Sequence, residues 1–104
     1  MTRGDIRWYS FRRPDKRRPV LILARDDVLE VVGEVIVVPA TRTIRGLSSE
    51  VALGLDDGMP VECVLNFDHL TLARRERIGE LICPLPPRRW DDIRAALLVA
   101  CGFE

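Results

Sequence analysis

Two side chains whose chemistry suits a phosphodiester stand where predicted strands meet loops. Arg18 precedes Pro19 and the apolar run 20–23, and Thr41 ends the largely β-branched segment 35–41. A guanidinium binds phosphate through charge-assisted hydrogen bonds, and a hydroxyl can donate to a phosphate oxygen. Such a pair could stabilise charge during RNA cleavage, in which the RNA supplies its own nucleophile, the 2′-hydroxyl. The spacing is equally compatible with an arginine that merely occupies the end of a strand.

More basic side chains lie in the loops beside these two positions. Residues 1–25 contain eight basic and two acidic residues, a local charge of +6 in a chain whose formal net charge is zero. A folded domain with this asymmetry can present a positive face to a polyanion while staying neutral overall. We therefore expect RNA contacts from Arg12, Arg13, Arg17, Arg42, Thr43 and Arg45.

The hydropathy pattern predicts short strands at 4–11, 20–23, 35–41, 50–53, 61–67 and 77–82. In these segments β-branched, alternating or continuous apolar residues gather. Pro39 has no N–H to donate to a ladder, so it should mark a bulge or a sheet edge. Residues 26–32 are expected to form a short helical turn capped by Asp26.

One long helix is predicted near the end of the sequence, from about Arg88 to Cys101. Trp90, Ile93, Leu97 and Ala100 repeat at helical spacing, which predicts an apolar stripe packed on the sheet. A length of 104 residues is typical of one domain, so the sequence predicts a single domain, residues 1–104. Its fold class is mainly β with a C-terminal helix: a strongly curved antiparallel sheet or partly open barrel under a helical lid.

The sequence contains no signature of a cofactor or metal. Neither Gly-x-x-x-x-Gly-Lys nor Gly-x-Gly-x-x-Gly occurs, so a nucleotide cofactor has no support. Three widely spaced cysteines without a Cys-x-x-Cys pair, and one histidine, argue against a zinc site. We expect reduced thiols in a cytoplasmic protein. No apolar run approaches the roughly 20 residues that span a bilayer, so no membrane contact is expected.

The other titratable side chains have structural explanations. His69 follows Asp68, which invites an acid–base role, but no serine or cysteine nucleophile stands nearby in the sequence. A structural or interface role is favoured for it. Asp56 and Asp57 precede Gly58, and turn chemistry explains this pair better than a catalytic dyad, because adjacent side chains diverge.

Seven segments in order resemble the MazF/PemK family of toxin endoribonucleases. They cover nearly the whole chain: Arg3–Ile6, Arg18–Ile22, Val35–Thr41, Glu50–Val51, Val64–Asp68, Ile78–Gly79, and Ala95–Leu97 with Gly102. The second resembles the family's Arg-Pro-Val-Leu-Val strand, and the third resembles the strand that ends in its threonine or serine.

This resemblance implies an SH3-like small barrel, a homodimer and metal-independent cleavage of single-stranded RNA at short sequences. The expected products are a 2′,3′-cyclic phosphate and a 5′-hydroxyl, and the expected consequence is inhibition of translation and growth. The family's catalytic arginine corresponds to Arg18 and its threonine to Thr41. Arg18 would transfer a proton and neutralise the phosphate, although a guanidinium is a poor general base near neutral pH. A cognate MazE-like antitoxin would occupy the positive groove.

One departure from the family pattern concerns the loop after the first strand. The family usually carries a longer loop containing Gly-Ser-Glu-Gln, whereas this chain has only residues 12–17 there. A shorter loop leaves the groove more open. We therefore expect the target to be either mRNA or a structured RNA loop such as a tRNA anticodon.

Two other functions remain open at this point. A CcdB-like toxin poisons DNA gyrase by binding and depends on a C-terminal Trp-Gly-Ile, whereas this chain ends Cys-Gly-Phe-Glu. The Arg18/Thr41 pair would have no purpose in such a protein. A non-catalytic nucleic-acid-binding barrel fits the charge but leaves Thr41 unexplained.

Overall fold

The computed structural model describes residues 1–12 and 17–104, so Arg13, predicted to contact RNA, lies outside the described residues. The strands are β1 (Asp5–Ser10), β2 (Arg17–Ile22), β3 (Glu34–Thr41), β4 (Glu50–Leu53), β5 (Cys63–Asn66), β6 (Thr71–Arg74) and β7 (Ile78–Pro84). Short 3₁₀ turns are η1 (Asp26–Val28), η2 (Leu55–Asp57), η3 (Phe67–His69), η4 (Arg75–Arg77) and η5 (Pro87–Arg89), and α1 (Trp90–Ala100) is the helix.

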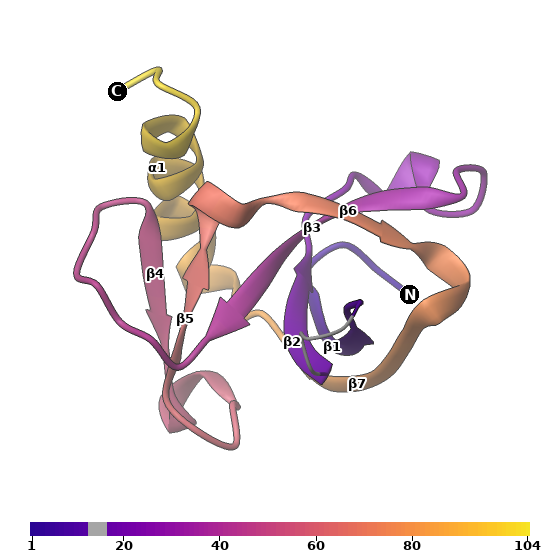
Figure 1. Cartoon of the computed structure of the whole chain (residues 1–104), viewed down its shortest axis with the longest axis horizontal. Coiled ribbons are helices and arrows are strands. Elements are labelled where there is room, and N and C mark those ends of the chain that lie inside the picture. Colours follow the sequence, from indigo (N-terminus) through magenta and orange to yellow (C-terminus); the bar gives the residue numbers. More distant parts are fainter. Residues whose placement is uncertain (13–16) are drawn as a thin grey trace.

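The strands form one curved antiparallel sheet in the order β4-β5-β3-β2-β1-β7, with β6 paired to β3 beside this path. Figure 1 shows β3 crossing the molecule between the side that holds β4, β5 and α1 and the side that holds β1, β2 and β7. Within the described chain the outer strands β4 and β7 do not pair with each other. The predicted mainly β fold with a C-terminal helix is confirmed, but the sheet is open rather than a closed barrel. Ile93 and Ala96 of α1 are buried in its core and cover apolar surface there.

Strand β3 is central because it pairs with three other strands. One edge pairs with β2, while the other pairs first with β6, up to Val37, and then with β5, from Ala40. Pro39 lies between these two partners. The sequence predicts Pro39 at a bulge or on the edge side near the strand's end; it pairs with Val20 on one edge, and on the other edge it lies in the gap between the β6 and β5 pairings. Its missing N–H is tolerated because the opposite edge changes partner at this point.

The segment 20–23 is fully buried, as predicted, and its side chains alternate between two apolar clusters. Leu21 and Leu23 belong to the first cluster, which includes Ile93 of α1. Val20 and Ile22 belong to the second. Both faces of β2 are therefore covered, which explains why its apolar run is continuous rather than alternating.

Strand β6 is not predicted from the sequence. Its Leu72 is 53% exposed whereas Ala73 is fully buried, so the larger apolar side chain faces outward. The expected turn at 26–32 exists as the shorter η1, but Asp26 is not its cap: Arg25 occupies that position. The Asp26 carboxylate instead accepts a hydrogen bond from the Arg3 N–H at 2.7 Å.

The N-terminal segment packs against the first residue of α1. The Arg3 guanidinium lies over the Trp90 ring, 4.3 Å from its centroid. At Gly4, where φ is +93°, an added Cβ would approach the Trp90 ring to 3.0 Å. Glycine is needed here for both the left-handed backbone and the close contact.

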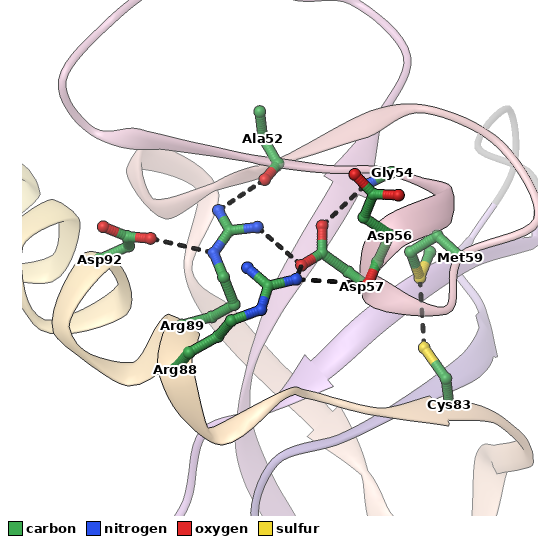
Figure 2. Close-up of polar contacts among 9 residues, drawn as sticks. All are labelled: Ala52, Gly54, Asp56, Asp57, Met59, Cys83, Arg88, Arg89 and Asp92. Atoms are coloured by element: carbon green, nitrogen blue, oxygen red, sulfur yellow. Dashed lines mark hydrogen bonds and ion pairs between the residues drawn. The ribbon is translucent and has the colours of Figure 1, made fainter.

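A buried carboxylate joins the turn η2 to the helix (Figure 2). One Asp57 oxygen accepts hydrogen bonds from Arg88 and Arg89, each at 2.9 Å, and the other accepts the Gly54 N–H at 3.0 Å. Arg89 also donates to the Ala52 carbonyl at 2.7 Å. Burial alone would raise the pKa of Asp57, but the Gly54 hydrogen bond and the two guanidinium groups outweigh it and lower that pKa. Asp57, which the sequence analysis assigned with Asp56 to turn chemistry, therefore connects β4, η2 and α1.

We expect Asp57→Asn to destabilise the protein by about 1–3 kcal/mol at pH 7, because it removes a charged acceptor from two guanidinium groups. The lowered pKa means that this contribution is complete above the unfolded-state value near 3.8 and is lost as the pH falls through the folded-state value. The difference in unfolding free energy between Asp57→Asn and wild type, measured by urea unfolding, should therefore narrow toward pH 3. Asp56→Asn, at the exposed neighbouring carboxylate, is the control. Equal stability of Asp57→Asn and wild type at pH 7 would contradict this account.

Candidate functional site

The register of β2 and β3 brings Arg18 and Thr41 together. Val20 of β2 pairs with Pro39 of β3. Because the strands are antiparallel, Arg18 and Thr41, each two residues beyond this pair, lie at the same end of the two strands. Side chains two residues apart point to the same face of a strand. Both are half-buried, and both line the same two open cavities.

The first cavity is polar and measures about 410 Å³. Its described lining offers two guanidinium groups, three hydroxyls, an amide and an imidazole, and no carboxylate: Phe11, Arg18, Pro39, Ala40, Thr41, Thr43, Arg45, Asn66, His69 and Thr71. These donors suit an anion with several oxygens, such as a phosphodiester.

The second cavity adjoins the first and is larger, about 690 Å³. Met59, Pro60 and Val61 give it an apolar wall, and Trp8 lines it from β1. The Arg17 guanidinium lies over the Trp8 ring, 4.5 Å from its centroid. An aromatic ring capped by a guanidinium beside an apolar wall provides a surface on which a base can stack.

Glu50, the first residue of β4, holds the loop that carries Arg42, Thr43 and Arg45. One of its carboxylate oxygens accepts the backbone N–H groups of Arg45, Gly46 and Leu47 at 3.1, 3.0 and 3.4 Å. This loop begins directly after Thr41, whose hydroxyl oxygen accepts the Thr43 N–H at 3.2 Å. The exposed Arg45 is thereby kept at the first cavity.

Most of the predicted site residues line the two cavities, but not all of them do. Arg17, Arg18, Thr41, Arg42 and Thr43 line the second cavity, and four of the predicted residues line the first: Arg18, Thr41, Thr43 and Arg45. Arg12 is exposed and lines a separate hollow beside β6, so the structure does not place it in either cavity. The catalytic and RNA-binding roles stay predictions.

Sequence reasoning missed Trp8 and favoured a structural or interface role for His69, and both residues line the cavities. His69 ends the turn η3 and lines the same cavity as Arg18 and Thr41. The turn is fixed by Asn66, which accepts the Asp68 N–H at 3.0 Å, and by Asp68, which accepts the Ser49 hydroxyl at 2.6 Å. The Asn66–Asp68 spacing is typical of such a turn, but nothing in the sequence shows which cavity the turn faces.

No group of three or more potential metal ligands is found among the described residues. Cys63 and Cys83 are buried, and burial raises the pKa of both thiols; Cys101 is exposed. In the described part of the chain, no helix has the length and apolar character needed to cross a membrane.

Both the sequence and the fold have known relatives. The family described as PemK-like, MazF-like toxin of type II toxin-antitoxin system matches residues 2–100. The probable endoribonuclease MazF2 of Mycobacterium tuberculosis is 38% identical over 103 residues, covering 98% of this chain and 99% of the relative. Mycobacterium tuberculosis toxin MazF-mt6 superposes with a TM-score of 0.87 at 29% identity, over 96% of this chain and 98% of that one. A MazE-MazF structure from Deinococcus radiodurans gives a TM-score of 0.81 at 26% identity, over 100% of this chain and 98% of that one.

We expect Glu50→Ala to loosen the loop 42–47. Each lost charge-assisted bond contributes about 1.5 kcal/mol or more, so amide exchange at Arg45 and Gly46 should accelerate about tenfold or more, as measured by hydrogen–deuterium exchange. Glu62→Ala, at an exposed carboxylate, is the matched control. Unchanged protection at both amides in Glu50→Ala would show that the carboxylate does not order the loop.

Proposed function

The chain belongs to the PemK-like, MazF-like toxin family of type II toxin–antitoxin systems, and we propose that it is an endoribonuclease toxin. It cleaves single-stranded RNA at short sequences without a metal ion, and it thereby inhibits translation and growth. The observation that carries this proposal is the placement of Arg18 and Thr41, from neighbouring strands, at one cavity. The names of the related mycobacterial proteins, which include endoribonucleases, support the same activity.

In the proposed reaction the RNA 2′-oxygen attacks the adjacent phosphorus and the bond to the 5′-oxygen breaks. The products are a 2′,3′-cyclic phosphate and a 5′-hydroxyl. Arg18 neutralises the charge that grows on the non-bridging oxygens, which is the largest contribution a fixed cation can make. Because the Thr41 oxygen accepts the Thr43 N–H, its own hydrogen is available to donate to a non-bridging oxygen. Proton transfer by Arg18 is the smaller part of its role, since a guanidinium stays protonated near neutral pH.

Nucleotides beside the cleaved bond would lie along the two cavities. Arg17, Arg42, Thr43 and Arg45 contact the backbone, and a base stacks in the cavity lined by Trp8. RNA contacts by Arg12, which lies outside the two cavities, and by Arg13 are proposed from the sequence alone. Both cavities are open to solvent, which fits either an unfolded mRNA or a protruding loop such as an anticodon.

The partners follow from the family and from the charge of the site. A toxin of a type II system is neutralised by a protein antitoxin, and the Deinococcus radiodurans relative was solved with MazE. We propose that a cognate MazE-like antitoxin lays an acidic segment across the cavities lined by Arg17, Arg18 and Arg45, where it excludes RNA. We also propose that the toxin acts as a homodimer.

We expect Arg18→Ala to lower the single-turnover cleavage rate in EDTA by about 100-fold or more, because it removes the cation at the phosphate. Thr41→Val should lower the rate less. The assay compares an unstructured RNA with an anticodon stem–loop and labels new 5′-hydroxyl ends. Arg25→Ala is the control, since Arg25 is exposed and paired with Asp27 at 2.9 Å.

Other outcomes of this assay point to other functions. RNA bound but never cut would select a non-catalytic binding protein. Trapping of DNA gyrase on DNA without RNA loss would select a CcdB-like poison. Cuts confined to the unstructured RNA would remove the anticodon proposal.

We expect Trp8→Ala to weaken binding of an uncleavable 2′-O-methyl RNA by about tenfold, because one stacked base contributes about 1–3 kcal/mol. Phe103→Ala removes an aromatic ring that is 76% exposed near the C-terminus and is the control. Fluorescence anisotropy at a fixed salt concentration measures the RNA affinity of both variants. Equal affinities of the two variants would place the bases elsewhere.

A further inference from the structure

The proposed cleavage requires a group that accepts the proton of the attacking 2′-hydroxyl, and neither Arg18 nor Thr41 suits that task. A guanidinium is already protonated near neutral pH, and a threonine hydroxyl is far too weak a base. The residue that accepts this proton must therefore be sought elsewhere around the two cavities, and its assignment rests on the proposed function.

The described lining of the two cavities leaves His69 as the candidate. Among the described residues that line these cavities there is no aspartate or glutamate that could act as a carboxylate base. Cys63 lines the second cavity, but it is buried and burial raises its pKa, so its thiol stays protonated. An imidazole gains and loses a proton between about pH 5 and 8. His69 is exposed at the first cavity, where a substrate can reach it.

The fold holds His69 near Thr41 through pairing on both sides of its turn. Before η3, Leu65 of β5 pairs with Ala40; after it, Thr71 of β6 pairs with Val37. The turn therefore spans the stretch of β3 at which the partner strand changes. Thr41 follows Ala40 in the same strand, so the imidazole and the hydroxyl are presented to one cavity from adjacent parts of the sheet.

Two cationic side chains share the first cavity with His69. Arg18 comes from β2 and Arg45 from the loop after β3, and both line the cavity with it. The neighbouring Asp68 accepts the Ser49 hydroxyl at 2.6 Å through one carboxylate oxygen. A neutral imidazole is the form that can accept a proton.

We propose that His69 is the general base of RNA cleavage. A ring nitrogen takes the proton from the 2′-hydroxyl as the 2′-oxygen forms its bond to phosphorus. The bond between phosphorus and the 5′-oxygen breaks, and the 5′-oxygen takes a proton from the Arg18 guanidinium, which recovers one from water. The imidazolium then releases its proton to solvent, which restores the enzyme and balances the reaction.

The test compares wild type with His69→Gln, His69→Ala and Leu70→Ala, the last changing an exposed side chain next to η3. Single-turnover rates are measured from pH 5 to 9, and affinity is measured with 2′-O-methyl RNA. His69→Gln should lose about 100-fold or more in rate near neutral pH, with affinity within about threefold of wild type. The rise in rate on the acid side of the profile should disappear in His69→Gln and persist in Leu70→Ala. Added imidazole should partly restore His69→Ala.

An RNA with sulfur in place of the bridging 5′-oxygen distinguishes a general-base role of His69 from a general-acid role. Its leaving group departs without a proton, so the His69→Gln defect should persist if His69 acts on the 2′-hydroxyl. Disappearance of the defect, or a wild-type profile in His69→Gln, would overturn the assignment while Arg18-dependent cleavage stands. If wild-type protein cuts no RNA, the proposed function itself fails and the assignment fails with it.

Discussion

The antiparallel register of β2 and β3 is the constraint on which the site depends. Pairing of Val20 with Pro39 brings together the strand ends that carry Arg18 and Thr41, and the same strand β3 pairs with β5 and β6 on its other edge. The first cavity is thus built around a single strand that changes partners. A slip of one residue in this register would turn Arg18 to the other face of the sheet, because successive side chains alternate.

Two carboxylates in this fold organise the scaffold and stay out of the two cavities. Asp57 is neutralised by two guanidinium groups and fixes the start of α1, while Glu50 accepts three backbone N–H groups and orders the loop after Thr41. Asp57 accepts hydrogen bonds through both oxygens, as a carboxylate removed from water requires, whereas Glu50 accepts them through one oxygen and its buried Oε2 has no partner among the described residues. The described lining of both cavities is consequently free of negative charge and suits a polyanion.

In the proposed reaction the nucleophile belongs to the substrate, so RNA cleavage asks little of the protein beyond position and charge. This explains how a small sheet can supply the necessary groups from strand ends and two loops. The rigid parts, β2 and β3, carry Arg18 and Thr41, and the turn η3 carries His69. The exposed loop with Arg42 and Arg45 is where the choice of RNA sequence would be expected to vary.

The sequence alone determined the parts of the fold that depend on local pattern. The buried run 20–23, the β-branched segment 35–41 and the stripe of α1 follow from composition and spacing, and Arg18 and Thr41 could be selected because each stands at the end of such a segment. The tertiary structure alone decided that β6 pairs with β3, that Asp57 meets Arg89, that Glu50 holds a loop, and that His69 and Trp8 face the cavities. These contacts join residues distant in sequence or depend on which strands pair, and pairing is set by the global burial of both sheet faces rather than by any local propensity.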